Sequence, residues 1–478
     1  MGKFLKKYKH EVILAILICI YIAYFITASF LKYDNFYAGR YDLGNMDQTV
    51  WNTLKGRIFQ TSDDNGVTIS RLSAHADFVL VLLSPFYLLW NNPKTLLLIQ
   101  TIALSLGAVF VYLISKEIIK NKNIALLFGF MFLMNPLVQY TNLYDFHAVT
   151  LATTFLLAAF YFLIKRKYPV MSLFLILSGI CKEQIWIIVA FFGFPLLLQK
   201  SKKVKLLGIG IIIISILAFY YLVSYFIPQA LGRQHFALAY YSDFGSSPIQ
   251  IIKNIVLSPR KTFILILEKS RLKYLAELFL PVGFISILSP LTLIFTVPDL
   301  IINLLSNNSG LRQIYYQYTA TITPFIFISS IYAVGQAIKW FPKISKKSIF
   351  AYLLIFTLIP AYFFGPLPGA KNPSLEMFIH SQKNKTLIDS YLSKIPESYS
   401  VAATNNLGAH LSHRQVIYTI PIGIGKADVI VFLLNDKFAQ PSLKEQKKLA
   451  NNLKQNKNYV EVFEKDDFII FKKRGILL

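Results

Sequence analysis

Long apolar segments recur along this sequence, and short clusters of Lys and Arg separate them. The first segment, at roughly 11–31, follows a Lys-rich start, and those at 94–115 and 204–227 adjoin the clusters KEIIKNKN and QKSKKVK. An apolar run of about 20 residues is the length that an α-helix needs to cross a bilayer. Basic clusters favour the cytoplasmic side. The pattern predicts an integral membrane protein with a cytoplasmic N-terminus.

Composition supports this class and excludes others. Of 478 residues, 55% are hydrophobic and 15% are charged, which is too apolar for an ordinary soluble protein. The net charge of +25 comes from short clusters between apolar segments, so no nucleic-acid partner is expected. Cys19 and Cys181 lie inside apolar segments and predict no disulfide framework. The basic N-terminal flank also occurs in signal peptides, but the apolar run is longer than theirs and favours a retained span.

The basic clusters, taken as cytoplasmic, define a path through the membrane. They predict an α-helical polytopic domain over 1–365 with about eleven transmembrane helices, in the plasma membrane. This domain contains an outer loop at 32–77, a short interfacial helix at 77–90 and a second outer region at 228–274. The apolar segments at 275–288 and 290–305 are short and contain prolines, so one of them could be re-entrant.

Residues 366–478 have the composition of a soluble domain, which this path places outside the cell. KTLIDSYLSKI and PSLKEQKKLANNLKQN predict helices, and SYSVAAT, VIYTI and ADVIVFLL predict strands. YVEVFEKD and FIIFKKR predict a closing hairpin. Helices that alternate with apolar strands indicate a small extracytoplasmic α/β domain.

Unusual polar residues collect on the outer side of the predicted path. They are Asp42, Asp47, His75, Asp77, Asp145, His147, Lys182 and Glu183. Ionisable groups at membrane level are costly unless they are paired or functional. We therefore predict a functional site at the outer face. Arg233, His235 and Asp243 of the second outer region carry little weight in this prediction.

Each group also has a purely structural interpretation. Asp42 and Asp47 precede helix-forming residues and could cap a helix. The HAD segment at 75–77 could cap the interfacial helix or hold a divalent cation, and the DFH segment at 145–147 could be a capped turn. Lys182 is a good point-charge ligand for phosphate, although it could instead form a buried ion pair with Glu183.

Arg312 lies in another outer turn, among several tyrosines, and could grip a lipid headgroup from the far side. Tyrosines near membrane interfaces also form an ordinary aromatic belt, which accounts for most of those near Arg312.

The order of these motifs resembles a family of uncharacterised polytopic membrane proteins of bacteria and archaea. This family is classed as a domain of unknown function and grouped with the GT-C glycosyltransferase superfamily. The resemblance covers most of the chain. It is carried by YDLGNMDQTVW (41–51), HAD (75–77), SPFYLLW (84–90), LLLIQ (96–100), YDFHAVTLA (144–152), CKEQ (181–184) and NNLGAHLSHRQVIY (405–418).

The resemblance implies a GT-C-like fold and a transferase that takes a sugar from a polyprenyl-phosphate donor at the outer face. The acceptor would be a glycan, a lipid or a protein. By position in the first outer loop, Asp42 is the first candidate for the general base and Asp47 the second. Lys182 and Arg312 would bind the donor phosphate. His75, Asp77, Asp145, His147 and Glu183 would shape the site, and Asp42, His75 and Asp77 are the candidates to hold an optional Mg²⁺ or Mn²⁺.

Two other functional classes fit the same residues. A transporter or flippase for a lipid-linked or anionic solute would line its passage with these charges, but transporters commonly contain repeated halves, and no internal repeat is evident. A non-catalytic membrane subunit would bind a partner or glycan through the outer α/β domain. Activity that survives the loss of Asp42 but not of 366–478 would indicate the subunit.

Overall fold

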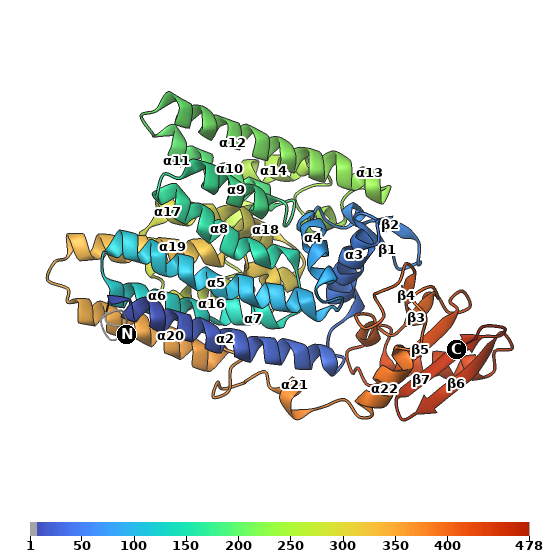
Figure 1. The fold of residues 1–478 in the computed structure, drawn as a ribbon. Coiled ribbons are helices and arrows are strands. Elements are labelled where there is room, and N and C mark those ends of the chain that lie inside the picture. The colour runs from blue at the N-terminus through green and yellow to red at the C-terminus, as the bar shows by residue number, and fades with distance from the viewer. Residues whose placement is uncertain (1–6, 478) are drawn as a thin grey trace.

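The computed structural model of the protein describes residues 7–477 and places a sheet domain at one end of a helical bundle (Figure 1). The bundle helices run roughly alongside one another, with the N-terminus at the end far from the sheet. Short elements of the first loop lie between the bundle and the sheet domain. The predicted soluble domain therefore meets the predicted outer loop.

Four helices are long and apolar enough to cross a membrane within the described residues, or five if one bent pair is a single span. They are α2 (Lys9–Asp34), α5 (Lys94–Ile119), α12 with its continuation through α13 (Lys202–Leu231), and α20 (Lys346–Phe364); the bent pair is α6 (Lys122–Met134) with α7 (Pro136–Leu143). The pair bends by 41° where Pro136 starts α7, and the Asn135 side chain accepts a hydrogen bond from the Leu137 amide. Membrane helices are thus confirmed, but the count of about eleven is not.

The other apolar helices are shorter than the prediction required. Among the apolar helices of 10–17 residues, the longest is α8 (Ala148–Ile164), whose 17 residues extend about 25 Å, less than the roughly 30 Å hydrocarbon core of a bilayer. The remaining helices of the bundle are α4 (Val79–Leu83), α9 (Tyr168–Gly179), α10 (Ile185–Phe191), α11 (Gly193–Leu197), α14 (Pro248–Leu257), α15 (Pro259–Ile266), α16 (Lys269–Phe279), α17 (Pro290–Leu293), α18 (Val297–Leu305) and the buried, 18-residue α19 (Thr323–Trp340). Prolines start α14, α15 and α17, where their fixed φ suits a first helical turn.

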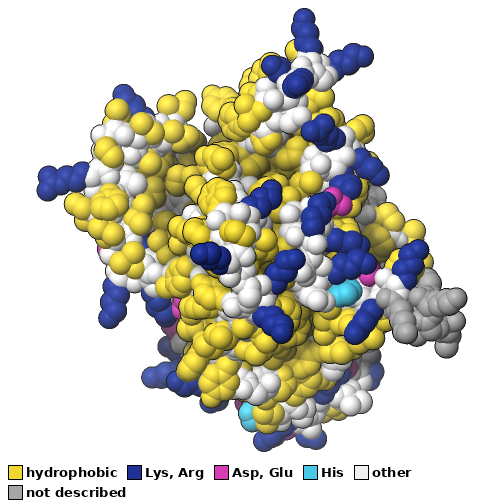
Figure 2. Space-filling view, turned by 90° about the vertical axis from the view of Figure 1, so that its left-hand side faces the viewer, with side chains coloured by type: hydrophobic (Ala, Val, Ile, Leu, Met, Phe, Trp, Pro, Cys, Tyr) yellow, Lys and Arg dark blue, Asp and Glu magenta, His cyan; other side chains and the backbone are white. Residues whose placement is uncertain are grey.

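Basic residues gather at the end of the bundle that carries the N-terminus. Figure 2 views this end and shows Lys and Arg side chains spread among apolar ones. Two ion pairs fasten its turns together: Glu11 with Lys116 at 2.9 Å, and Glu117 with Lys165 at 3.0 Å. The Lys-rich turns and the acidic loop therefore lie at opposite ends of the bundle, as the positive-inside pattern requires.

The C-terminal domain is a five-stranded sheet between two layers of helix. Its strands are β3 (Val401–Ala403), β4 (Ile417–Thr419), β5 (Val429–Leu433), β6 (Tyr459–Lys465) and β7 (Phe468–Lys473), and its helices are α21 (Glu376–Ile379), α22 (Lys385–Leu392) and α23 (Leu443–Lys454). The strand order is β4-β3-β5-β7-β6, in which β3, β4 and β5 are parallel and β6 and β7 form an antiparallel hairpin. Every strand and helix predicted here from the sequence is confirmed.

The alternating directions of the side chains along the central strands explain why helices cover both faces of the sheet. Val429 and Val431 of β5 pack with Ile388 of α22, whereas Ile430 packs with Leu453 of α23 on the opposite face. Successive side chains of a strand point to opposite faces, so a strand that is apolar throughout must be covered on both sides. All five residues of β5 are buried.

The sheet domain is docked onto the first loop through very close contacts. Phe36 belongs to the core that lies between α22 and the sheet. The Asn405 side chain accepts hydrogen bonds from the backbone amides of Arg40 at 2.9 Å and Tyr41 at 3.4 Å. A Cβ atom at Gly408 would stand 2.2 Å from the Cβ of Arg40, so glycine alone allows this approach. The loop and the domain thus form one packed unit.

Candidate functional site

Asp42 lies on an irregular turn at the sheet-domain end of the bundle. Residues Arg40–Gly44 form a single π-helical turn, closed by a hydrogen bond from the Gly44 amide to the Gly39 carbonyl at 3.0 Å, and α3 (Asn45–Leu54) follows directly. Such single π turns are frequent at functional sites. The Asp42 side chain is 33% exposed, so its carboxylate can reach a substrate.

Two side chains from the turn before α8 hold the Asp42 carboxylate. His147 Nε2 lies 3.1 Å from one carboxylate oxygen, and the Tyr144 hydroxyl donates to the other at 3.2 Å. Burial by itself raises the pKa of Asp42. The hydrogen bond and charge of His147, the charge of Lys32 and the Tyr144 hydroxyl outweigh burial, so the pKa lies below its usual value. Asp42 is therefore ionised at neutral pH.

Asp145 holds in place the turn that carries Tyr144 and His147. Lys32, at the end of α2, donates to the Asp145 carboxylate at 2.8 Å and to the Leu143 and Tyr144 carbonyls at 3.0 and 2.9 Å. Burial, together with the charge of Asp42, raises the pKa of Asp145 despite the neighbouring ammonium. The structure thus brings together three residues predicted from the sequence: Asp42, Asp145 and His147.

Asp47 is separate from this group and fully buried. The hydroxyls of Tyr87 and Ser412 both donate to its carboxylate, and His413 Nε2 lies 3.1 Å from it. Ser412 and His413 belong to the sheet domain, so Asp47 joins the first loop to that domain. Sequence reasoning did not single out these three partners, although all three lie in segments that carry the family resemblance.

The Asp47–His413 contact predicts a pH-dependent stability. Burial lowers the pKa of His413, but the charge and hydrogen bond of Asp47 outweigh burial and raise it above 6.5. Stabilisation by the charged imidazole is therefore fully present below the unfolded pKa of about 6.5 and is lost as the pH rises through the folded value. We expect thermal denaturation of detergent-solubilised protein to show this loss in the wild type and not in His413→Gln. Identical pH profiles would contradict the assignment.

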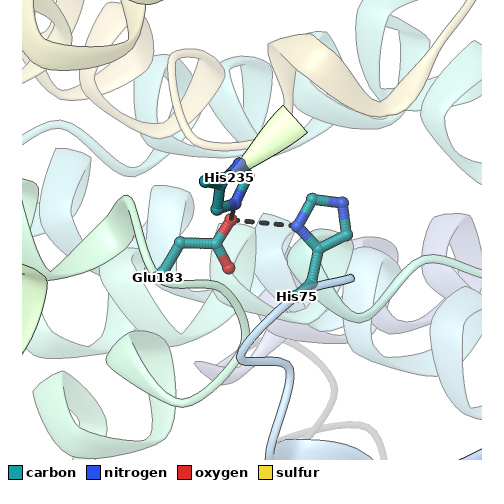
Figure 3. Close-up of side chains that lie close together, drawn as sticks. All are labelled: His75, Glu183 and His235. Carbon is teal, nitrogen blue, oxygen red and sulfur yellow. Dashed lines mark hydrogen bonds and ion pairs between the residues drawn. The ribbon is translucent and has the colours of Figure 1, made fainter. Parts of the chain in front are cut away.

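A third group joins three distant segments: His75 from the first loop, Glu183 from the α9–α10 connection and His235 from the second outer region (Figure 3). One Glu183 oxygen lies 2.9 Å from His75 Nδ1 and 3.6 Å from His235 Nε2, and the other accepts the Ala76 amide at 3.0 Å. Burial raises the pKa of Glu183, but the two imidazoles more than offset it, so the pKa lies well below its usual value. Burial lowers the pKa of His75 by more than the charge of Glu183 raises it.

The metal ligands predicted from sequence are not brought together. Asp77 forms a buried ion pair with Arg71 at 2.8 Å, and Asp42 contacts His147 rather than His75. Among residues 7–477, the group of three potential ligands that could hold a metal is His75 with Glu183 and His235. His235 was the member that sequence reasoning undervalued.

The two predicted phosphate ligands also differ in environment. Lys182 is half-buried, and within the described chain its ammonium forms no hydrogen bond or ion pair. Its charge acts on Glu183 and on the buried Asp299. Arg312 instead donates to the carbonyls of Ser306 and, at 3.4 Å, Asn303. Arg312 is thus engaged in holding its own turn.

An apolar cavity of about 370 Å³ adjoins the third group. Side chains of α10, α12, α14 and α18 form most of its wall, including Phe219, Ile251 and Ile301. Glu183 and His235 also line the cavity. A polar head and an apolar wall together suit an amphiphilic ligand.

Comparison with known proteins identifies a family without an assigned reaction. A family model described as "Predicted membrane protein (DUF2079)" matches residues 32–470, well over half of the chain. No match was found among curated proteins. The matched range begins at the end of α2 and includes the first loop, the bundle helices from α5 to α20 and nearly all of the sheet domain.

Proposed function

We propose that this chain, which belongs to the DUF2079 family of predicted membrane proteins, is a GT-C-type glycosyltransferase. In this proposal it transfers a sugar from a polyprenyl-phosphate donor to an envelope acceptor at the outer face of the plasma membrane. The observation that carries the proposal is Asp42, an ionised and partly exposed carboxylate on an irregular turn. In this proposal, other polar groups at the same end of the bundle supply what the transfer needs besides the base.

Asp42 acts as the general base. It accepts the proton of the acceptor hydroxyl while that oxygen attacks the anomeric carbon, and the bond between this carbon and the lipid phosphate breaks with its electron pair on the phosphate. His147 and Tyr144 hold the carboxylate in place during this step. Attack from the face opposite the phosphate inverts the anomeric centre.

Lys182 receives the charge that grows on the departing phosphate. The Lys182 ammonium has no partner in the described chain and lies next to two residues that line an apolar cavity. This arrangement suits an anionic group attached to an apolar chain. The cavity would hold the first part of the polyprenyl chain. A donor that is already activated also explains why the sequence has no nucleotide-binding motif.

The remaining candidates support the site indirectly. Asp145 fixes the turn that carries Tyr144 and His147, and the Asp77–Arg71 pair fixes the segment next to His75. Asp47 attaches the sheet domain rather than serving as a second base. Arg312 stabilises the turn at 303–312. With the basic end of the bundle in the cytoplasm, the site and the sheet domain face outward.

The test is the transfer of labelled sugar from a panel of polyprenyl-phosphate sugars, with wild type compared with Lys182→Gln. Loss of a charge-assisted interaction of about 1.5–3 kcal/mol predicts a fall in kcat/KM for the donor of roughly 10–100-fold. Lys426→Gln, which changes an exposed lysine of the sheet domain, is the matched control and should behave as wild type.

Two outcomes would overturn the proposal. Wild type that moves lipid-linked solutes across vesicle membranes without transferring sugar from any donor would be a flippase. Wild type with neither activity, but with glycan binding that requires residues 366–478, would be a binding subunit.

A further inference from the structure

We propose that His75, Glu183 and His235 form a binding site for a zinc ion. This inference goes beyond sugar transfer and does not depend on that proposal. The number of metal ions bound per chain can be measured whatever reaction the protein catalyses. It also replaces the Mg²⁺ or Mn²⁺ site expected at Asp42, His75 and Asp77, which have different partners in the fold.

The spacing of the three side chains suits a small tetrahedral ion. One potential ligand atom from each residue lies within 4.8 Å of the others, and the two nitrogens lie 2.9 and 3.6 Å from the same Glu183 oxygen. Zinc binds His nitrogen and carboxylate oxygen at about 2.0–2.2 Å, which separates neighbouring ligands by about 3.3 Å. Only small shifts are needed to centre an ion among them.

His235 provides an independent observation that points to a ligand. The residue is only 5% exposed, and its Nε2 faces the Glu183 carboxylate at 3.6 Å, too far for a hydrogen bond, with no hydrogen-bond partner elsewhere in the described chain. A buried polar atom without a partner is unfavourable. An ion between Nε2 and Glu183 would satisfy it.

Binding requires both imidazoles to change tautomer. His75 Nδ1, which donates to the Glu183 carboxylate, must give up its proton to that ring's Nε2 before it can bind a metal. Nδ1 of His235 accepts a hydrogen bond from the Ala237 amide at 3.1 Å, which leaves the ring proton on Nε2. Ligation through Nε2 needs that proton on Nδ1, so the metal-bound ring gives up the Ala237 bond. A hydrogen-bonded His–Glu–His group that never holds a metal is the competing arrangement, and the experiment separates the two.

The donor set selects the metal and its role. Two imidazoles and one carboxylate suit zinc, whereas Mg²⁺ prefers an octahedron of oxygen atoms. Three protein ligands leave a fourth position, which is the pattern of catalytic rather than structural zinc. Because Glu183 and His235 also line the apolar cavity, an anionic group held there is the natural fourth ligand.

The test is metal analysis of full-length protein purified in detergent with a histidine-free affinity tag. After dialysis against Zn²⁺ and then against metal-free buffer, we expect wild type to retain one zinc per chain. We expect affinity for Zn²⁺, measured against a competing chelator, to fall in His75→Ala, Glu183→Gln and His235→Ala. The fall should exceed the roughly 10–100-fold that loss of an outer-shell partner costs. His380→Ala removes an exposed histidine and should bind as wild type does.

A second measurement guards against misfolded variants. Co²⁺ in place of zinc should give wild type the visible absorption of a tetrahedral site, and Glu183→Gln, which preserves the side-chain shape, should lose it while eluting as folded protein. Wild type without bound zinc, or variants that retain zinc as tightly as wild type, would overturn the site. Zinc bound by protein that transfers no sugar would uphold the metal site and refute only the proposed reaction.

Discussion

Replacing Asp42 by Asn should lower the rate of sugar transfer by about 10²–10⁴-fold, the range typical for loss of a general base. The amide keeps the size of the carboxylate, and its single oxygen can still accept a hydrogen bond from one of the two partners, His147 or Tyr144. It cannot take a proton from the acceptor hydroxyl. The fall should therefore appear in kcat, with little change in the KM for the donor, when initial rates are measured over a range of donor concentrations.

The matched control is Asp64→Asn in the same loop. Asp64 is exposed, and within the described chain its side chain forms no hydrogen bond or ion pair, so its amide variant should keep wild-type activity. Both variants should elute and melt as wild type does. If Asp42→Asn transferred sugar at the wild-type rate, Asp42 would not be the base. A fall in both variants alike would point to loop charge rather than to proton transfer.

Replacing Asp47 by Ala should destabilise the protein by about 3–5 kcal/mol, the cost typical of breaking a buried charged network by removing one partner. The change leaves Tyr87 and His413 facing a cavity without an acceptor, and leaves Ser412 with its bond to the Ala409 carbonyl alone. Because two of these partners belong to the sheet domain, the damage should be concentrated where that domain meets the first loop. We expect a lower Tm in detergent and faster proteolytic release of the segment after Phe364.

Asp64→Ala serves as the reference for Asp47→Ala. An exposed surface substitution of this kind usually changes stability by less than about 0.5 kcal/mol. Activity of Asp47→Ala should fall only as far as its folded fraction falls, whereas Asp42→Asn should be inactive while folded. An Asp47→Ala protein that melts as wild type does and resists proteolysis would show that this network does not attach the domain.

Local patterns predicted the C-terminal domain well. Each strand and helix there has its own signal, such as the apolar run of β5 or the Ser442 and Glu445 capping box that starts α23. The bundle was harder to predict from such patterns. Hydropathy identifies α2 and α5. The helices α8 to α11 are equally apolar but too short to qualify as separate spans by length. The sequence does not predict where they end, because their ends depend on the segments that pack around them.

The candidate site was predicted in part. Segments near Asp42, Asp145 and His147 carry recognisable motifs, and the expectation that they share one end of the bundle agrees with their contacts. His235 was undervalued because it lies more than a hundred residues from His75 in a region without a motif. Its role depends on a turn that places Nε2 beside Glu183.

The sequence by itself determined that this is a membrane protein with basic residues at one end of its helices and a small α/β domain after them. These properties follow from hydrophobicity, charge and alternation within short segments. Only the tertiary structure decided that Asp42 is partly exposed whereas Asp47, five residues later, is buried. Burial depends on which distant segments pack on each side of the turn, here the turn before α8 and the sheet domain, and no local pattern encodes that choice.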